Sequence, residues 1–326
     1  MTVFPDGRDV ASTDPVLDVS ASPQTEQRNP RTVDIDLLPT RTVLGLLNAE
    51  DELVPVAVRR ALDPLAEMVD EAAGLVRGGG RVHYFGAGSS GRIAVLDAAE
   101  LIPTFGLAPG IVVAHLAGGS GAFEHPVEGA EDDSARGGAD ATGVTGGDMA
   151  VGLSASGRTP YVAGALTAAA ARGAFTALVT CNPGSPLRSL AQMAIVADTG
   201  PEAIAGSTRL KATSALKLIL NSFSTALMIR LGKTYSNLMA DVTATNSKLR
   251  TRRVRILIDA SGASAAECEA ALAAADADVR VAMVTLLSGA GVPDARAALV
   301  TGAGSVRGAL AVLGQTTGSP PDPPPR

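Results

Sequence analysis

The sequence predicts an α/β protein with three layers, a parallel sheet flanked by helices, followed by a small C-terminal helical domain. Short and almost wholly apolar stretches recur along the chain, and segments with helical spacing lie between them. Parallel strands that are buried on both faces give continuous apolar stretches of this kind. The expected strands are residues 81–85, 110–119, 148–154, 175–181 and 193–197.

The region before the first strand predicts a tail and two helices. Residues 1–30 are rich in Pro, Ser, Thr and Asp without any period, so we expect most of them to be a disordered tail. A short helix is expected within residues 33–48, and a clearer amphipathic helix over residues 53–77. Three glycines, Gly78 to Gly80, end that helix.

From Ser207 onward the pattern is helical. Long helices are expected at residues 211–231 and 233–252, and polar residues interrupt the first of these, so we interpret it as a buried helix and not a membrane span. Four shorter Ala-rich helices follow, at residues 264–275, 277–288, 293–300 and 304–313. The chain is thus divided into a tail (1–30), an α/β domain with N-terminal helices (31–255), a helical bundle (256–314) and a Pro-rich tail (315–326).

The amino-acid composition limits the kinds of molecule that the protein is expected to bind. The 326 residues are 46% hydrophobic but only 3% aromatic, and the net charge is −6. Nucleic acid and anionic membranes are therefore not expected as partners, because they need basic patches or aromatic platforms. The cysteines, Cys181 and Cys268, form no metal-type pair, and no signal peptide is evident, which favours reduced thiols in a cytoplasmic protein.

Two similar loops follow expected strands. Gly86-Ala-Gly-Ser-Ser-Gly-Arg92 and Gly152-Leu-Ser-Ala-Ser-Gly-Arg158 each precede a helix. Small residues at a helix N-terminus let backbone N–H groups approach an anion, and serine hydroxyls add donors. The first loop also fits a dinucleotide fingerprint, but no acidic residue ends the second strand to bind a ribose. A phosphosugar is thus favoured over a nucleotide.

Carboxylates for acid–base chemistry come from two segments. Glu100 lies among apolar residues on the helix after the first loop, and is equally consistent with a raised-pKa general acid and with a solvated carboxylate. The acidic run from Glu124 to Asp133 is typical of a solvated surface, with a divalent-metal site including His125 as the alternative. Within this run Glu128 is the best candidate for a buried carboxylate.

Two cations begin the long helix near residue 211. Arg209 and Lys211 oppose the helix dipole there, which suggests that they serve an anion, either a substrate or another chain. Ion pairs with Glu202 or Asp198 are the alternative.

Together these motifs resemble the N-acetylmuramic acid 6-phosphate etherases, a branch of the sugar isomerase (SIS) domain family. The resemblance extends from about Thr25 to Ala275. Its matching stretches are Asp34-Ile-Asp36, Gly86–Arg92, Pro103-Thr-Phe-Gly106, Val127-Glu-Gly-Ala-Glu-Asp132, Ser154–Tyr161, Cys181-Asn-Pro-Gly184, Gly206-Ser-Thr-Arg209, Asn237-Leu-Met239 and Ala244-Thr-Asn246.

The resemblance implies a cytoplasmic lyase, without a cofactor or metal, in peptidoglycan recycling. Such enzymes cleave the C3 ether of N-acetylmuramate 6-phosphate by elimination and water addition, giving N-acetylglucosamine 6-phosphate and D-lactate. By motif, Glu100 corresponds to the family's acid and Glu128 to its second catalytic glutamate. The resemblance also implies a homodimer. The expected contacts to the phosphorylated amino sugar are Gly88, Ser89, Ser90, Ser154, Ser156, Thr159, Arg209 and Lys211.

A second reading comes from a related SIS branch. Its members bind a phosphosugar without catalysis and regulate a partner protein, as the glucokinase regulatory protein does. Those proteins are longer and carry two SIS domains, whereas this chain has one SIS domain and keeps both glutamates.

Overall fold

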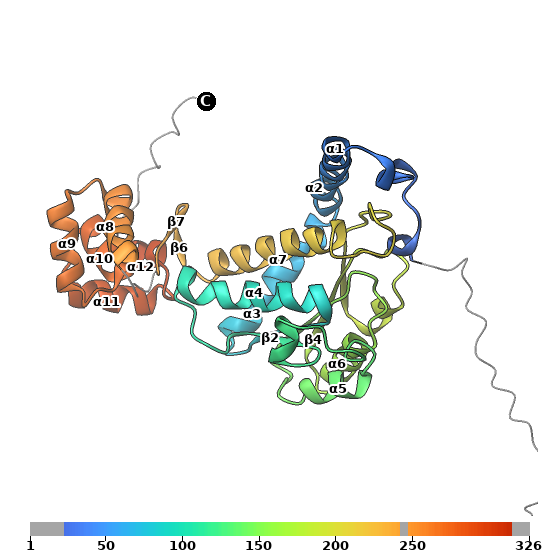
Figure 1. The fold of residues 1–326 in the computed structure, drawn as a ribbon. Coiled ribbons are helices and arrows are strands. Elements are labelled where there is room, and N and C mark those ends of the chain that lie inside the picture. The colour runs from blue at the N-terminus through green and yellow to red at the C-terminus, as the bar shows by residue number, and fades with distance from the viewer. Residues whose placement is uncertain (1–22, 242–246, 315–326) are drawn as a thin grey trace, which may run out of the picture.

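The computed structural model describes residues 23–241 and 247–314. Its centre is a parallel five-stranded sheet with the order β2-β1-β3-β4-β5. Figure 1 shows strands β2 and β4 beside the helices α4 and α6. All five strands lie where the apolar stretches predict them. Their bounds are β1 Val82–Gly86, β2 Val112–Leu116, β3 Met149–Leu153, β4 Phe175–Thr180 and β5 Met193–Val196.

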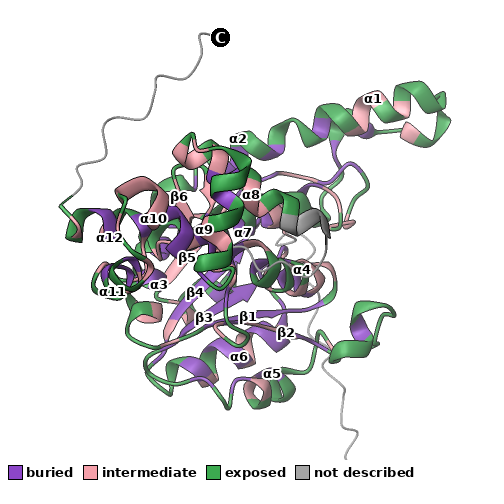
Figure 2. Ribbon diagram, turned by 90° about the vertical axis from the view of Figure 1, so that its left-hand side faces the viewer, coloured by how far each residue is buried: buried purple, intermediate pink, exposed green. Residues whose placement is uncertain are grey.

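Successive side chains of each strand point to opposite faces of the sheet. Because helices cover both faces, the fold has three layers. Tyr84 and Val151 point into one apolar core, and their neighbours Phe85 and Ala150 point into another on the opposite face. The first core is closed by α3 (Leu62–Arg77), α4 (Gly88–Phe105) and α7 (Lys211–Arg230), and the second by α5 (Ser134–Asp140) and α6 (Pro160–Ala170). Both faces of the sheet are buried as a result (Figure 2).

The N-terminal segment is more ordered than its composition suggests. Residues 24–32, mostly assigned to a tail, form 3-10 turns in which Thr25, Asn29 and Thr32 are buried against the segment 201–206. Residues 23–30 are ordered because long-range contacts outweigh their polar composition. Residues 1–22 lie outside the described part, so the expected tail stays a prediction. The elements here are η2 Gln24–Glu26, η3 Pro30–Thr32, η4 Ile35–Leu37, α1 Thr40–Asp51 and α2 Leu53–Arg59.

The chain after α7 departs from the expected long helix over residues 233–252. Gly232 and Ser236 have positive φ, and a two-stranded hairpin takes the place of the helix before α8 begins. The C-terminal helices share a third apolar core and lie beyond one end of the sheet (Figure 1). The remaining elements are η5 Ser120–Phe123, η6 Pro186–Leu190, β6 Thr234–Tyr235, β7 Leu238–Met239, α8 Ser247–Ser261, α9 Ala265–Ala274, α10 Val279–Ser288, α11 Val292–Thr301 and α12 Val306–Val312. The boundary near residue 256 and the tail 315–326 stay predictions, and the tail lies outside the described residues.

Helix α7 is long and apolar enough to cross a membrane by length and composition. Half of the apolar stretch is buried within the protein, and the helix packs against α2, α3 and α4. These contacts agree with its interpretation as a core helix.

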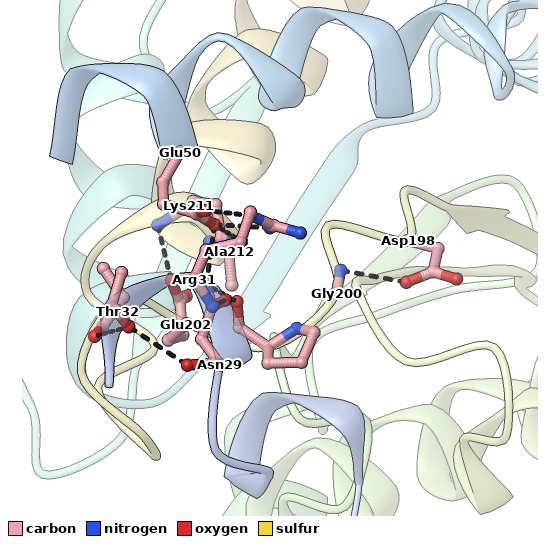
Figure 3. Close-up of polar contacts among 11 residues, drawn as sticks. Asn29, Arg31, Thr32, Glu50, Asp198, Gly200, Glu202, Lys211 and Ala212 are labelled. Carbon is pink, nitrogen blue, oxygen red and sulfur yellow. Dashed lines mark hydrogen bonds and ion pairs between the residues drawn. The ribbon is translucent and has the colours of Figure 1, made fainter. Parts of the chain in front are cut away.

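A buried ion-pair network joins the N-terminal segment to α7 (Figure 3). The Glu50 carboxylate accepts hydrogen bonds from Lys211 Nζ at 2.6 Å, from Asn29 Nδ2 at 2.8 Å and from the Arg31 guanidinium at 2.5 and 2.8 Å. These partners, Arg31 first, lower the pKa of Glu50 to about 2 against the opposing effect of burial. Glu202 accepts the backbone N–H groups of Lys211 and Ala212 and so caps α7.

Substitution Glu50→Gln is expected to destabilise the protein by about 3–5 kcal/mol, because the fully buried Lys211 ammonium loses its only carboxylate within ion-pair distance among the described residues. Urea unfolding measures the change. Glu52→Gln, at an exposed carboxylate two residues away that bonds Asn48, is the matched control and should stay within about 0.5 kcal/mol. Equal effects in the two variants would contradict the assignment.

Two histidines meet across the neighbouring strands β1 and β2. His83 Nδ1 lies 3.1 Å from His115 Nε2, and the His115 ring stacks on Phe85 with centroids 4.4 Å apart. One ring must donate and the other accept, so the pair holds together only while at least one is neutral. Burial lowers the pKa of both residues, that of His115 to about 4. Asp148 faces His83 at 3.9 Å and partly offsets this.

The histidine pair predicts a loss of stability in mild acid. Because the folded pKa values lie below 6.5, the unfolded chain binds more protons, and stability falls as the pH drops from 6.5 toward 4. Thermal melting between pH 6.5 and 5 should therefore show a falling Tm. His115→Gln should flatten this slope, and an unchanged slope would exclude the pair as its source.

Candidate functional site

The two glycine–serine loops meet at the carboxyl edge of the sheet. Strand β1 lies between β2 and β3, and Gly86 is in register with Leu116 and Leu153. The strand order reverses at β1, which is the topological switch point where ligands bind to parallel sheets. This register makes the loops after β1 and β3 neighbours at the edge of the sheet.

The first loop leads directly into α4. Gly91 packs so closely on Gly86 that a Cβ at residue 91 would lie 2.5 Å from the Gly86 carbonyl oxygen. Ala87, at the N-cap, has no side chain that could bond the first-turn N–H groups, and Gly88 has φ +52°. Gly88 is exposed, Ser89 half-buried and Ser90 buried. The open helix N-terminus suits an anion.

The second loop is held by the loop after β4. Asn182 Nδ2 donates to the carbonyl of Ser156 at 2.8 Å, and Ser185 Oγ donates to the carbonyl of Gly157 at 2.7 Å. Ser154 and Thr159 are buried and lie 2.8 Å apart through their hydroxyl oxygens. Ser156 is half-buried, so it is the hydroxyl of this loop with surface left for a ligand.

A cavity of about 180 Å³ lies between the first loop and the segment that follows β2. Gly88, Arg92 and Glu131 contribute its polar groups, and Val127 and Ala130 are among its apolar ones. Arg92 Nε donates to the carbonyl of Phe123 at 3.0 Å, which fixes the guanidinium stem beside the cavity. A cation, a helix N-terminus and a carboxylate thus border one small space.

Glu131 is a cavity-lining carboxylate that sequence reasoning did not single out, and like Glu128 it is exposed. Its Oε1 accepts a hydrogen bond of 3.0 Å from Thr159 Oγ1, and this ties the acidic run to the second loop. Glu128, expected to be the buried member of this run, is exposed and is not among the residues that line the cavity, so the expectation of burial is wrong. Turns occupy residues 128–132, so no regular period indicates which of these side chains faces inward.

Glu100 lies away from the cavity. It is exposed on α4, and with a rise of about 1.5 Å per residue its position is about 18 Å along the helix from Gly88. Asp97, one turn earlier, is buried and accepts hydrogen bonds from Tyr84 at 3.2 Å and Ser224 at 3.0 Å, which fixes α4 on β1 and α7. Within one chain, Glu100 does not meet the cavity.

The two cationic side chains near the start of α7 lie in different environments. Arg209 is exposed, whereas Lys211 is fully buried and its ammonium bonds Glu50. The anion that Lys211 serves in this chain is therefore Glu50, which lies 161 residues away in sequence, and neither Glu202 nor Asp198 is its ion-pair partner. Cys181 and Cys268 are free and buried, as expected.

Parts of this chain are similar to a protein-family model and to solved structures. Residues 64–170 match the family model of the glucokinase regulatory protein N-terminal SIS domain. A phosphoheptose isomerase structure from Francisella tularensis is similar over 58% of this chain and 98% of its own, with 14% identity and a TM-score of 0.44.

Curated relatives cover most of the chain. The N-acetylmuramic acid 6-phosphate etherase of Thermobifida fusca is 58% identical over 81% of this chain and 87% of its own length. The protein of the same name from Brucella anthropi is 47% identical over 88% of this chain and 94% of its own. At this identity and coverage, the chain belongs to the N-acetylmuramic acid 6-phosphate etherase family.

Proposed function

We propose that this protein cleaves the D-lactyl ether of N-acetylmuramate 6-phosphate, giving N-acetylglucosamine 6-phosphate and D-lactate in amino-sugar catabolism. The observation that carries the proposal is the cavity in which the α4 N-terminus, Arg92 and Glu131 meet. The relatives at 47–58% identity bear the etherase name, which favours the enzyme over a non-catalytic phosphosugar-binding regulator.

The geometry supports an elimination on the open-chain sugar. The α4 N-terminus and Arg92 bind the phosphate, and the half-buried Ser89 and Ser156 have surface left for phosphate and hydroxyl oxygens. Glu131 takes the C2 proton, the C3–O bond breaks, and an acid gives a proton to the departing lactate oxygen. Water then adds to the unsaturated aldehyde. Glu131 replaces Glu128 in this assignment because it lines the cavity and is held by Thr159.

We also propose that the protein acts as a homodimer in which the acid comes from the second copy. Glu100 lies one helical turn from Leu96 on an exposed face of α4, and Leu96 is 40% exposed. An exposed apolar side chain beside a carboxylate can be covered by a subunit contact. A second copy packed on it would supply apolar surroundings to Glu100 and place it at the partner's cavity. Arg209 is also exposed and is therefore available to the shared site.

The reaction itself is tested with purified protein and N-acetylmuramate 6-phosphate. We expect release of D-lactate without added nucleotide, and loss of turnover by about 10³-fold or more in Glu131→Gln, as for removal of a general base. Glu128→Gln is the matched control from the same run and should keep turnover. Phosphosugar binding without lactate release would support the regulator instead, and loss in Glu128→Gln alone would return the base to Glu128.

The shared site predicts complementation between two inactive variants. In a dimer that joins Glu100→Gln with Glu131→Gln chains, one of the two sites keeps both glutamates. Random pairing after co-expression should therefore restore about a quarter of the wild-type activity. The measurement is lactate release by the mixture and by each variant alone. If each site used both glutamates of one chain, the mixture would stay inactive.

A further inference from the structure

A second and larger cavity lies at the free edge of β2. Its volume is about 580 Å³, compared with about 180 Å³ for the cavity beside Gly88. Strand β2 is the first strand of the sheet, and no strand of the described residues pairs with its outer edge. Val95 of α4 and Arg136 of α5 both line the cavity, so it extends around this edge from one face of the sheet to the other. We call it the edge groove.

The backbone of Ala114 is open to the edge groove. The Ile111 carbonyl and the Ala117 N–H bond β1. Such bonds alternate along a strand, so Ala114, which lies midway between these residues, directs its N–H and C=O away from β1. Ala114 is half-buried and lines the groove. Unpaired backbone groups on an edge strand can bind an extended peptide as an added strand.

The cation of the groove is held ready for an anion. Arg136 Nε forms an ion pair of 2.8 Å with one carboxylate oxygen of Asp140, and the other oxygen accepts a hydrogen bond of 2.7 Å from the Tyr161 hydroxyl. Tyr161 is fully buried, so it anchors Asp140 from the core. The two terminal nitrogens of Arg136 bond no other group within the part of the chain that the structure describes. Two neighbouring N–H groups of a guanidinium suit a carboxylate.

Glu124 gives the groove the opposite charge. It is exposed, lines the groove and forms no ion pair with any described residue. Because Asp140 is already paired, Glu124 is the carboxylate left for a cationic group. Leu116 and Phe123, which is 45% exposed, add apolar surface. The groove therefore combines an anion site, a cation site, an open strand edge and apolar side chains.

We propose that the edge groove binds a peptide of two or three residues with both termini free. The peptide backbone pairs with Ala114, its carboxylate bonds Arg136, and its ammonium lies at Glu124. An apolar side chain of the peptide contacts Leu116 and Phe123. A single amino acid carries the same charges but has no peptide group to pair with a strand edge. A sugar phosphate has no ammonium in reach of Glu124 unless its amine is free.

Titration calorimetry of the whole protein with alanyl-leucine and alanyl-leucyl-alanine tests the proposal. We expect saturable binding with a Kd of about 0.1–1 mM for at least one of the two, as for ligands of this size. Free leucine should bind about tenfold more weakly or less. Saturating N-acetylglucosamine 6-phosphate should not displace the peptide, because the groove and the cavity beside Gly88 are separate. Displacement, or no binding up to about 10 mM peptide, overturns the proposal.

Matched variants test the two charged contacts. Arg136→Gln should weaken binding by about 10- to 100-fold, because a charge-assisted hydrogen bond is lost. Arg172→Gln is the control, because Arg172 is exposed, bonds the Ala168 carbonyl and does not line the groove, and Kd should change less than about twofold. Glu124→Gln should weaken binding of the free peptide but not of its N-acetylated form.

Modified peptides decide the question even if a variant fails to fold. The C-terminal amide of the peptide should bind the wild type about 10- to 100-fold more weakly than the free carboxylate. An amide that binds as tightly as the free carboxylate overturns the contact with Arg136 and with it the proposal. Lactate release by the wild type is measured separately, so failure of the proposed etherase function and failure of peptide binding are distinguishable.

Discussion

The packing of the end of β1 on the first turn of α4 determines where the rest of the site lies. No side chain fits between Gly86 and Gly91, so the helix begins directly at the edge of the sheet. Its first turn has no capping side chain and borders the cavity between the first loop and the segment that follows β2. The β2 segment supplies Glu131 to that space, and the β3 loop supplies the hydroxyls that hold it.

Local pattern was sufficient to predict the layers of this fold. Each strand is an almost wholly apolar stretch. A stretch such as Phe175–Thr180 can be recognised as a strand without knowledge of the rest of the chain. The site depends on pairings that no local pattern contains. That the loops after β1 and β3 are neighbours follows from the strand order, and the partner of Lys211 is Glu50, 161 residues away.

The errors have physical causes of the same kind. Glu128 and Glu131 belong to one acidic run without a helical or extended period, so the side chain at the cavity could be identified only from the cavity lining and from its bond to Thr159. The helix expected over residues 233–252 had suitable residues, but two left-handed residues, Gly232 and Ser236, turn the chain back into a hairpin. The order of residues 24–32 comes from their contacts with the segment before α7.

The hydroxyls of Thr159 and Ser154, which form a chain behind Glu131, also limit how a proton can move. A row of hydroxyls conducts protons only if its far end can release or take one up, and here the far end is the amide of Gly157, which does neither. If Glu131 is the base, as we propose, a proton that it takes from the substrate has no exit through the protein along this path. The proton then leaves by the cavity, to product or to water, and the base is reset without exchange through the interior of the protein.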